Sequence, residues 1–304
     1  MEKLSIGNFN ITKIVEFVGP TFDLNFLLPE ANPDVVQEHK DWLFPNYVDP
    51  DSGILILSYH SYLVRTPRYN ILVDSCVGND KERPEFPEMH KLNTDYLQKL
   101  QTAGVRPEEI DFVMCTHLHP DHIGWNTRLE DGRWVPTFPK ARYLFGKTEY
   151  QAWEQYNKEI AGSANDPIPP AVSRTIQLSF NDSVLPIIEA NRAEMIDEGY
   201  EVEDGFTVES APGHAPGNFV FSLASQSDRG MLSGDMLHHP LQLVHPNWSS
   251  GFCADPLLSA QTRRNMLERI ADTNTVLMPA HFPTPTWGVV KAKGDGFRLQ
   301  VPDA

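Results

Sequence analysis

Three histidines and one aspartate lie within the six residues 117–122, directly after an apolar segment that ends at Cys115. Eleven histidines are spread over 304 residues, so this density is far above the average of the chain. In an extended segment residues i and i+2 project to the same side, which brings His117 and His119 together. Asp121 and His122 follow one turn later and are placed to face a second ion. Neutral imidazole and carboxylate are zinc ligands, so the run predicts a metal site at a strand end.

Three more candidate ligands follow strand-like segments elsewhere in the chain. Residues 206–210, 230–234 and 275–279 are apolar, and each segment leads within a few residues to one nitrogen or oxygen ligand: His214, Asp235 and His281. A site built on rigid elements holds its geometry better than one built on free loops. The three strand ends are therefore expected to complete the metal site.

The charge balance limits the class of substrate. The formal net charge is −16, from 25 Lys and Arg against 41 Asp and Glu. Such a surface repels phosphate backbones and anionic lipid, so the chain predicts a small neutral substrate and neither a nucleic-acid nor a membrane partner. Three widely spaced cysteines, Cys76, Cys115 and Cys253, favour free thiols over disulfides or a thiolate zinc site. Cys115 is expected to be a core thiol, and a ligand role for Cys253 is disfavoured.

No apolar run approaches the roughly 20 residues that cross a bilayer, and the first residues lack the pattern of a secretory signal. The expected location is therefore the cytoplasm.

The organisation of the chain is that of an interleaved α/β protein. Two β-branched and aromatic runs, 54–64 and 69–74, flank Thr66-Pro67-Arg68 and predict a hairpin. Apolar patterns predict further strands at 111–115, 141–145, 206–210, 218–223, 230–233 and 275–278, and helices at 94–103, 148–161, 180–189 and 257–270.

The domain organisation follows from the absence of breaks. The length of 304 residues allows one or two domains, but no flexible linker or composition break separates two cores. We therefore expect a single domain over 1–304, with an N-terminal arm at about 20–50 and a helical insertion at about 146–204. The sequence leaves open whether arm and insertion form lids or a homodimer contact.

Four short motifs, in this order and over roughly residues 55–285, resemble those of the metallo-β-lactamase superfamily: HLHPDH at 117–122, PGH at 212–214, SGD at 233–235 and PAH at 279–281. The resemblance implies an α/β fold, the four-layer αβ/βα sandwich with two mixed β-sheets flanked by helices. It also implies seven ligands, three for a first ion, three for a second and one shared by both: His117, His119 and His214; Asp121, His122 and His281; and Asp235.

Within that superfamily the chain looks most like the branch of acyl-homoserine-lactone lactonases and methyl parathion hydrolase. Lactonases of the quorum-quenching type generally carry a tyrosine three residues after the bridging aspartate, whereas this chain has His238. A histidine there resembles the methyl parathion hydrolase pattern. His238 is accordingly a candidate for contact with substrate, and packing at the sheet edge is the alternative.

These features lead to a hypothesis for the function. We expect a dinuclear metal-dependent hydrolase that opens a neutral ester or lactone by attack of a metal-bridging hydroxide, with Asp121 orienting it and carrying a proton to the leaving group. Zinc is the first choice for both divalent ions, and manganese, iron or cobalt suit the same donors. The alternatives are a phosphotriester or β-lactam hydrolase, a mononuclear iron-dependent oxygenase, or a binding protein with little turnover.

Residues beside the ligands complete the expected site. Trp125 and Phe282, each close to a ligand in sequence, are expected to contact substrate, because pockets for neutral molecules are largely apolar. Asp74, at the end of its strand, is a candidate acceptor for the second N–H of a ligating imidazole. A simple turn residue is an equally good interpretation of Asp74.

Overall fold

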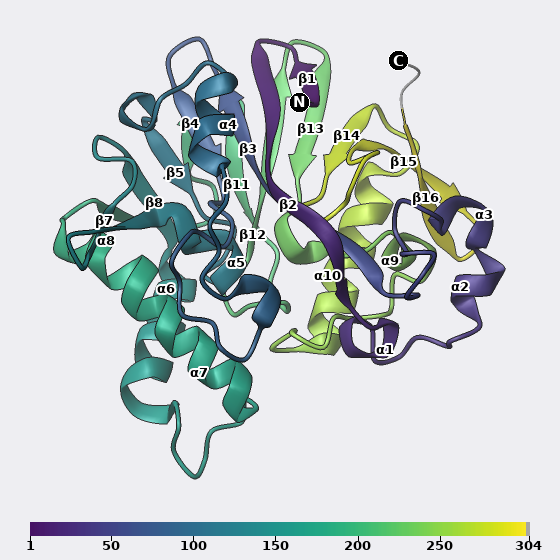
Figure 1. Ribbon diagram of the computed structural model, residues 1–304. Coiled ribbons are helices and arrows are strands. Elements are labelled where there is room, and N and C mark those ends of the chain that lie inside the picture. Colours follow the sequence, from purple (N-terminus) through teal and green to yellow (C-terminus); the bar gives the residue numbers. More distant parts are fainter. Residues whose placement is uncertain (302–304) are drawn as a thin grey trace. The chain divides into compact units, whose positions relative to one another are not determined.

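The computed structural model describes residues 1–301 and divides into two compact units, each made of two stretches of chain (Figure 1). Unit 1 comprises Met1–Phe17 and Tyr59–Asp197, and unit 2 comprises Val18–Ser58 and the chain from Glu198 onward. The predicted single domain over 1–304 stays a prediction. Within the described residues, no helix combines the length and the apolar character that a membrane span requires.

The first sheet has seven strands in the order β1-β2-β3-β4-β5-β8-β9. Antiparallel pairs join β1 to β2 and β3 to β4, while β4, β5, β8 and β9 run parallel, so the sheet is mixed. Its strands are β1 (Lys3–Ile6), β2 (Phe9–Phe22), β3 (Leu55–Arg65), β4 (Asn70–Val73), β5 (Phe112–Met114), β8 (Arg142–Gly146) and β9 (Ala193–Ile196). A separate two-stranded sheet pairs β6 (Thr127–Glu130) with β7 (Arg133–Pro136).

The predicted hairpin is confirmed. β3 and β4 pair antiparallel from Tyr62 opposite Val73 to Arg65 opposite Asn70, and the turn between them holds Pro67. The predicted strands at 111–115 and 141–145 are also confirmed as β5 and β8. Parallel pairing of β4, β5 and β8 explains why these segments are continuous apolar runs, since such strands are buried on both faces.

The helices of unit 1 pack on a shared apolar core. They are α4 (Tyr96–Thr102), α5 (Pro120–Ile123), α6 (Lys147–Gln155), α7 (Pro170–Ser179) and α8 (Leu185–Glu189), with π-helical turns at Tyr156–Ile160 and Phe180–Val184 and short 3₁₀ turns at Pro87–Met89, Pro107–Glu109 and Gly124–Asn126. Side chains from strands and helices, such as Leu72, Tyr143, Trp153 and Ile176, form one cluster.

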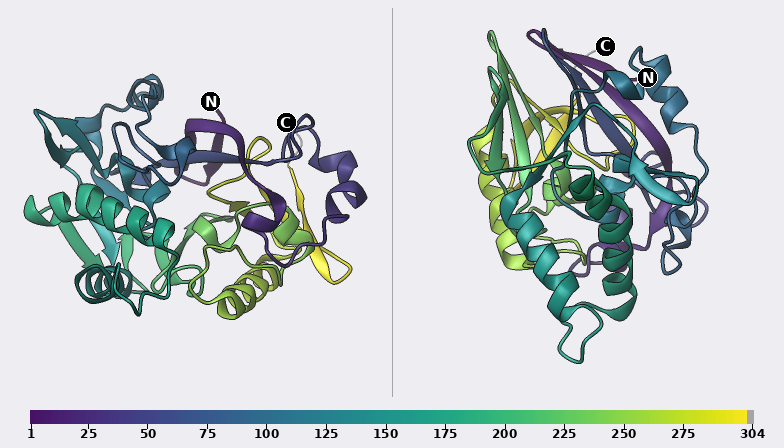
Figure 2. Two further views of the ribbon diagram at one scale, coloured as in Figure 1. Left: turned by 60° about the horizontal axis from the view of Figure 1, so that its bottom comes forward. Right: turned by 90° about the vertical axis from the view of Figure 1, so that its left-hand side faces the viewer.

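The region 146–204 contains the helices α6, α7 and α8 and also the strands β9 and β10, and its helices are divided differently from the prediction. The predicted helix at 148–161 is α6 extended by a π-helical turn, and that at 180–189 is a π-helical turn followed by α8. α7 was not predicted, because its run of small and hydroxyl residues hides the apolar spacing of Val172 and Ile176. Figures 1 and 2 show α6 and α7 as a helical pair joined by the loop 161–169.

Unit 2 contains the second seven-stranded sheet, in the order β10-β11-β12-β13-β14-β15-β16. Only β13 and β14 pair in parallel. The strands are β10 (Glu201–Glu203), β11 (Phe206–Ser210), β12 (Phe219–Ser225), β13 (Asp228–Leu232), β14 (Thr275–Met278), β15 (Gly288–Lys293) and β16 (Gly296–Gln300). The predicted strands β11 to β14 are confirmed, whereas the terminal hairpin of β15 and β16 was not predicted.

The helices of unit 2 differ in length. Three four-residue helices form the N-terminal arm, and α10 packs on the sheet with Met266, Leu267 and Ile270 in the core. The helices are α1 (Leu24–Leu27), α2 (Val35–Glu38), α3 (Lys40–Leu43), α9 (Leu241–Val244) and α10 (Pro256–Ile270), with a 3₁₀ turn at Gly234–Met236. α10 confirms the helix predicted at 257–270. Its N-cap is Asp255, whose carboxylate accepts a hydrogen bond from Leu258 N at 3.0 Å.

The loop after β4 and the turn after α5 lie in backbone contact within unit 1. Gly124 N donates to Cys76 O at 2.7 Å and Trp125 N donates to Ser75 O at 2.8 Å. A Cβ on Gly124 would lie 1.7 Å from Val77 O, so only glycine permits this approach. The contact fixes the turn that follows His122.

Glu16 on β2 anchors the same region. Its buried carboxylate accepts hydrogen bonds from Val77 N at 2.8 Å, Trp125 Nε1 at 2.6 Å and Thr94 Oγ1 at 3.2 Å. Burial raises the pKa of the Glu16 carboxyl from 4.5 to about 7, although these donors lower it.

The close approach at Gly124 predicts a large loss of stability on substitution. Gly124→Ala should lower the free energy of unfolding by at least about 2 kcal/mol, because a Cβ has no room against the Val77 backbone. Urea unfolding of the variant measures the loss. Gly19→Ala is the matched control, since a Cβ there meets nothing within 4 Å. Equal stability of the two variants would contradict the contact.

The raised pKa of Glu16 predicts a pH-dependent contribution to stability. Because the folded-state pKa of about 7 lies above the ordinary 4.5, the native state holds the proton more tightly than the unfolded state. The resulting stabilisation is present below pH 4.5 and is lost as the pH rises through 7. Relative to Glu16→Gln, the free energy of unfolding of the wild type should therefore fall across this window. A difference that does not change with pH would contradict it.

Candidate metal centre

Unit 1 contains the predicted ligand turn, residues 117–122, which runs from the end of β5 into α5. The rings of His117 and His119 lie 4.5 Å apart, and those of His117 and His122 lie 4.2 Å apart, measured between centroids. One ring nitrogen of His117 and one of His119 lie within 4.8 Å of each other, as do a carboxylate oxygen of Asp121 and a ring nitrogen of His122. The four predicted donors of this turn therefore form two neighbouring pairs.

Asp74 orients His122 from the end of β4. Its Oδ2 lies 2.9 Å from His122 Nδ1, and its Oδ1 accepts a hydrogen bond from Thr116 N at 2.8 Å. The residue is buried and has a φ of 56°, so it also makes the turn after the strand. Asp74 thus contacts the second nitrogen of one predicted ligand, His122, and the ligand role of His122 stays a prediction. With Nδ1 engaged by Asp74, Nε2 of His122 is the nitrogen left for a metal.

Glu149 is a residue of this region that the sequence analysis missed. It is fully buried on α6, where its Oε1 accepts hydrogen bonds from Leu118 N at 3.0 Å and from Trp153 Nε1 at 2.6 Å. Leu118 lies between two ligands, so this bond fixes their backbone. The one sequence signal for Glu149 was an acidic residue at an apolar position of a predicted helix.

In unit 2 three predicted ligands lie just after three strands. His214 follows β11, Asp235 lies in the 3₁₀ turn after β13, and His281 follows β14. All three are buried. The approach before His214 needs a glycine, because Gly213 has a φ of 121° and a Cβ there would lie 2.2 Å from Ser259 N.

Asp235 lies among three imidazoles within unit 2. Its Oδ1 is 3.1 Å from His281 Nε2, and its Oδ2 is 3.3 Å from His214 Nε2 and 3.1 Å from His238 Nε2. The two oxygens of one carboxylate therefore face different predicted ligands. This arrangement suits a carboxylate shared by two ions.

The second nitrogens of these imidazoles also have neighbours. His281 Nδ1 lies 3.2 Å from Ser58 O, and His214 Nδ1 lies 3.6 Å from Cys253 Sγ. Both contacts leave Nε2 directed toward Asp235. Cys253 thus adjoins a predicted ligand through the nitrogen that faces away from the carboxylate, whereas Cys115 is buried in unit 1 with Asn126 as its neighbour.

His238 lies beside the carboxylate as the spacing of three residues from Asp235 suggested. Its backbone N donates to Gln242 Oε1 at 2.7 Å, and its side chain is buried. Nδ1 of the ring has no hydrogen-bond partner among residues 1–301. A buried polar atom of this kind fits a site that receives a further polar group.

The two aromatic residues expected to contact substrate lie in the cores of their units. Trp125 is 4% exposed, stacks on Tyr96 and donates its indole N–H to Glu16. Phe282 is 0% exposed and packs with the residues under the second sheet. Direct contact of either side chain with a substrate stays a prediction.

The donor set of the two units consists of imidazole nitrogens and carboxylate oxygens, which suits zinc and other borderline divalent ions. The Nδ1 atom of His122 lies beside the Asp74 carboxylate, and that of His281 lies beside the Ser58 carbonyl. These contacts fix the orientation of both rings. The residues present therefore fit divalent metal ions.

Comparison with known proteins identifies relatives of the chain. An N-acyl homoserine lactonase of Bacillus thuringiensis is 24% identical over 244 residues, 75% of this chain and 82% of that protein. Among solved structures, AidC, a dizinc quorum-quenching lactonase in complex with a product, has a TM-score of 0.81 at 24% identity and covers 100% of this chain and 97% of its own. The hydrolase AbOPH has a TM-score of 0.80 at 22% identity, with coverages of 99% and 97%.

The likeness to these structures confirms the predicted fold class, with two mixed sheets and flanking helices. The model of the metallo-beta-lactamase superfamily matches residues 56–281, which is most of the chain and contains all seven predicted ligands. This match confirms the prediction of a metal-dependent hydrolase. The chain belongs to the metallo-beta-lactamase superfamily.

Proposed function

We propose that this chain is a dinuclear metal-dependent hydrolase that opens a neutral lactone or ester. The observation that carries the proposal is the carboxylate of Asp235, whose two oxygens face His281 and His214 separately at 3.1 and 3.3 Å. A carboxylate that serves a single ion has no need of this arrangement. The names of the relatives support the choice of lactone, because they include N-acyl homoserine lactonases.

We assign the ligands as the superfamily resemblance implies. Three imidazoles would hold the first ion, two imidazoles and a carboxylate the second, and one carboxylate both: His117, His119 and His214; His122, His281 and Asp121; and Asp235. Zinc is the first candidate for both positions, and the dizinc lactonase AidC supports it. When bound, the ions supply a deprotonated water at neutral pH and polarise the substrate carbonyl.

The chain's own residues have three tasks in this reaction. Asp121, whose side chain is 17% exposed, holds and transfers a proton between the attacking water and the leaving alcohol. His238 lies 3.1 Å from the shared carboxylate and is placed to meet the substrate. Asp74 fixes the ring of His122, so that Nε2 stays directed toward the ion.

The net charge supports a neutral substrate over a phosphorylated polymer. At −16, the summed field of the chain disfavours the approach of a nucleic acid. The histidine at position 238 keeps phosphotriesters as the second candidate substrate class, since they too are neutral. β-Lactams and iron-dependent oxygenation have no specific support from the residues described here.

The direct test of the proposal is acid release in a pH-stat from the zinc-loaded protein, with aliphatic and aromatic lactones and esters as substrates. We expect release that depends on the ligand turn and is lost in His117→Ala. Release from phosphotriesters alone would replace the lactone assignment by the second candidate. No release from either class would contradict a hydrolase of neutral esters.

Removal of the shared carboxylate should abolish both metal binding and turnover. In Asp235→Ala we expect the zinc content to fall below two ions per chain and activity to fall by more than about 100-fold. This loss exceeds the roughly 10- to 100-fold that usually follows removal of a residue that only orients a metal ligand. Metal analysis and the pH-stat assay measure both. Asp204→Ala, in the exposed turn before β11, is the control. An Asp235→Ala protein with two ions and full activity would contradict the assignment.

Neutralising the partner of His122 should weaken metal binding without unfolding the chain. Asp74→Asn keeps an acceptor for Thr116 N but removes the charge that orients His122. We expect zinc affinity to fall roughly 10- to 100-fold in a chelator competition. Asp111→Asn is the matched control, because that exposed carboxylate also accepts a backbone bond, from Asn70 N at 2.8 Å. Unchanged zinc affinity in Asp74→Asn would show that the pair does not serve the metal.

A further inference from the structure

Arg263, in the middle of α10, is a fully buried guanidinium whose N–H groups all have acceptors. Five contacts satisfy it: Nε donates to Met236 O at 2.9 Å, Nη1 to Pro246 O at 3.0 Å and Trp248 O at 2.8 Å, and Nη2 to Ser259 Oγ at 3.1 Å and Ser249 Oγ at 3.4 Å. Three segments of unit 2 therefore meet at one side chain: the turn of Met236, residues 246–249 and α10. The planar fork of arginine suits such a junction, and lysine cannot replace it.

The charge of Arg263 is unusual for such a position. Within residues 1–301 it makes no ion pair with a carboxylate, and its acceptors are carbonyls and hydroxyls. Burial lowers the pKa of the guanidinium to about 10, so it stays charged at neutral pH. A buried charge without a paired acid costs free energy that an apolar side chain would not cost. Its position between the elements that carry metal ligands offers a reason for its presence.

One branch of these contacts reaches His214. Ser259 Oγ accepts from Arg263 and also from Cys253 Sγ at 3.4 Å, and Cys253 Sγ lies 3.6 Å from His214 Nδ1. If Nε2 of His214 is a metal ligand, as proposed above, Nδ1 carries the hydrogen and can donate it to the thiol.

The other branch reaches Asp235. Nε of Arg263 holds the carbonyl of Met236, which is the residue after Asp235 in the same 3₁₀ turn. This bond fixes the turn from which the carboxylate projects. A single guanidinium is thus connected to two predicted ligands that are far apart in sequence.

We propose that Arg263 is a positioning residue of the metal centre, which sets His214 through Ser259 and Cys253 and sets Asp235 through the Met236 carbonyl. This inference rests on the proposed function, because it requires His214 and Asp235 to be ligands. Arg263 touches no reacting atom and acts only on the geometry of the ligands. Its loss should therefore change metal affinity before it changes any step of the reaction.

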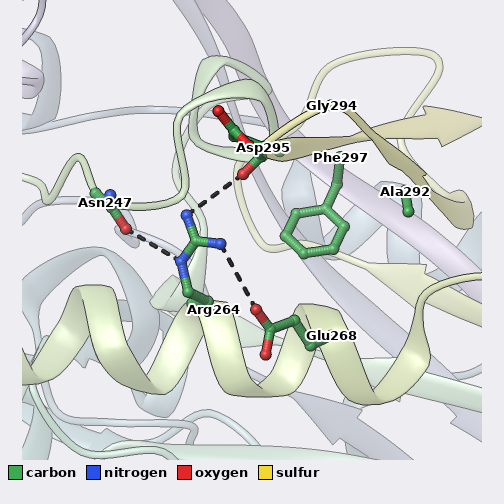
Figure 3. Close-up of a pocket in the computed structure, with 8 residues that line it drawn as sticks. Asn247, Arg264, Glu268, Ala292, Gly294, Asp295 and Phe297 are labelled. Atoms are coloured by element: carbon green, nitrogen blue, oxygen red, sulfur yellow. Dashed lines mark hydrogen bonds and ion pairs between the residues drawn. The ribbon is translucent and has the colours of Figure 1, made fainter.

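The next residue of α10 provides a matched control. Arg264 lines a surface cavity of about 560 Å³, together with residues that include Asn247, Glu268 and Asp295 (Figure 3). Its Nε donates to Asn247 Oδ1 at 3.2 Å, and its Nη1 lies 3.6 Å from a Glu268 carboxylate oxygen. Arg263 and Arg264 share a helix and a charge but have different surroundings.

The experiment compares zinc affinity in Arg263→Lys and Arg264→Lys by competition with a chromophoric chelator, and thermal unfolding of each metal-free protein. We expect Arg263→Lys to bind zinc at least about 10-fold more weakly, because loss of a residue that orients a metal ligand typically costs that much affinity. Arg264→Lys should bind zinc like the wild type. A variant that lowers only the unfolding temperature, with unchanged zinc affinity, would show a purely structural role and overturn the proposal.

A second pair of variants covers the case in which Arg263→Lys does not fold. Cys253→Ala removes the acceptor of His214 Nδ1, whereas Cys253→Ser keeps one. We expect Cys253→Ala to bind zinc more weakly than the wild type and Cys253→Ser to retain more of the affinity. Equal zinc affinity in the two variants would overturn the connection from Arg263 to His214.

The same measurements separate this inference from the proposed function. If the wild type itself binds no zinc, the proposed function fails and this inference fails with it. If the wild type and all variants bind zinc equally well, only this inference is refuted.

Discussion

The buried carboxylate of Asp235 is the constraint on which the rest of this structure depends. It lies among three histidines, and its oxygens are 3.1 to 3.3 Å from their Nε2 atoms. A buried carboxylate is costly unless positive charge compensates it. The neighbouring imidazoles balance that charge only when protonated, whereas divalent ions do so with neutral imidazoles as ligands. The donor set is therefore best explained as a place for metal ions.

Rigid elements and close backbone contacts keep the donors in position. In unit 1, Asp74 and Glu149 tie the ligand turn to β4 and α6 from two sides. Gly124 permits the backbone contact with the loop after β4, and Gly213 permits the approach of the His214 loop to α10 in unit 2. These contacts serve the same purpose, since a ligand that moves by a fraction of an ångström no longer holds its ion in the right geometry.

The chain keeps the fold of its relatives at low sequence identity, 24% to a lactonase. The superfamily match covers residues 56–281, which contain all the strand ends that carry predicted ligands. Polar side chains lie around those ligands: Cys253 lies beside His214, and Arg263 donates to the carbonyl of Met236, next to Asp235. His238 stands where quorum-quenching lactonases generally carry a tyrosine, 3.1 Å from the Asp235 carboxylate, and its contact with substrate stays a prediction.

The sequence by itself determined a predicted ligand set and the strands that carry it. The histidine run is dense, and each further ligand follows an apolar run, so local pattern was sufficient to predict β5, β11, β13 and β14. The hairpin of β3 and β4 followed from the same kind of signal. Where the apolar spacing was weak, as in α7 and in the hairpin of β15 and β16, local pattern failed.

Only the tertiary structure decided which side chains support the ligands. Glu149 and Arg263 lie far from the ligands in sequence, and no spacing connects them to the site. Trp125 was expected to meet a substrate from its place beside a ligand, yet its neighbours are Glu16 and Tyr96. The reason is physical: local sequence fixes the direction of a backbone, but a side chain's partners depend on which distant segments pack against it.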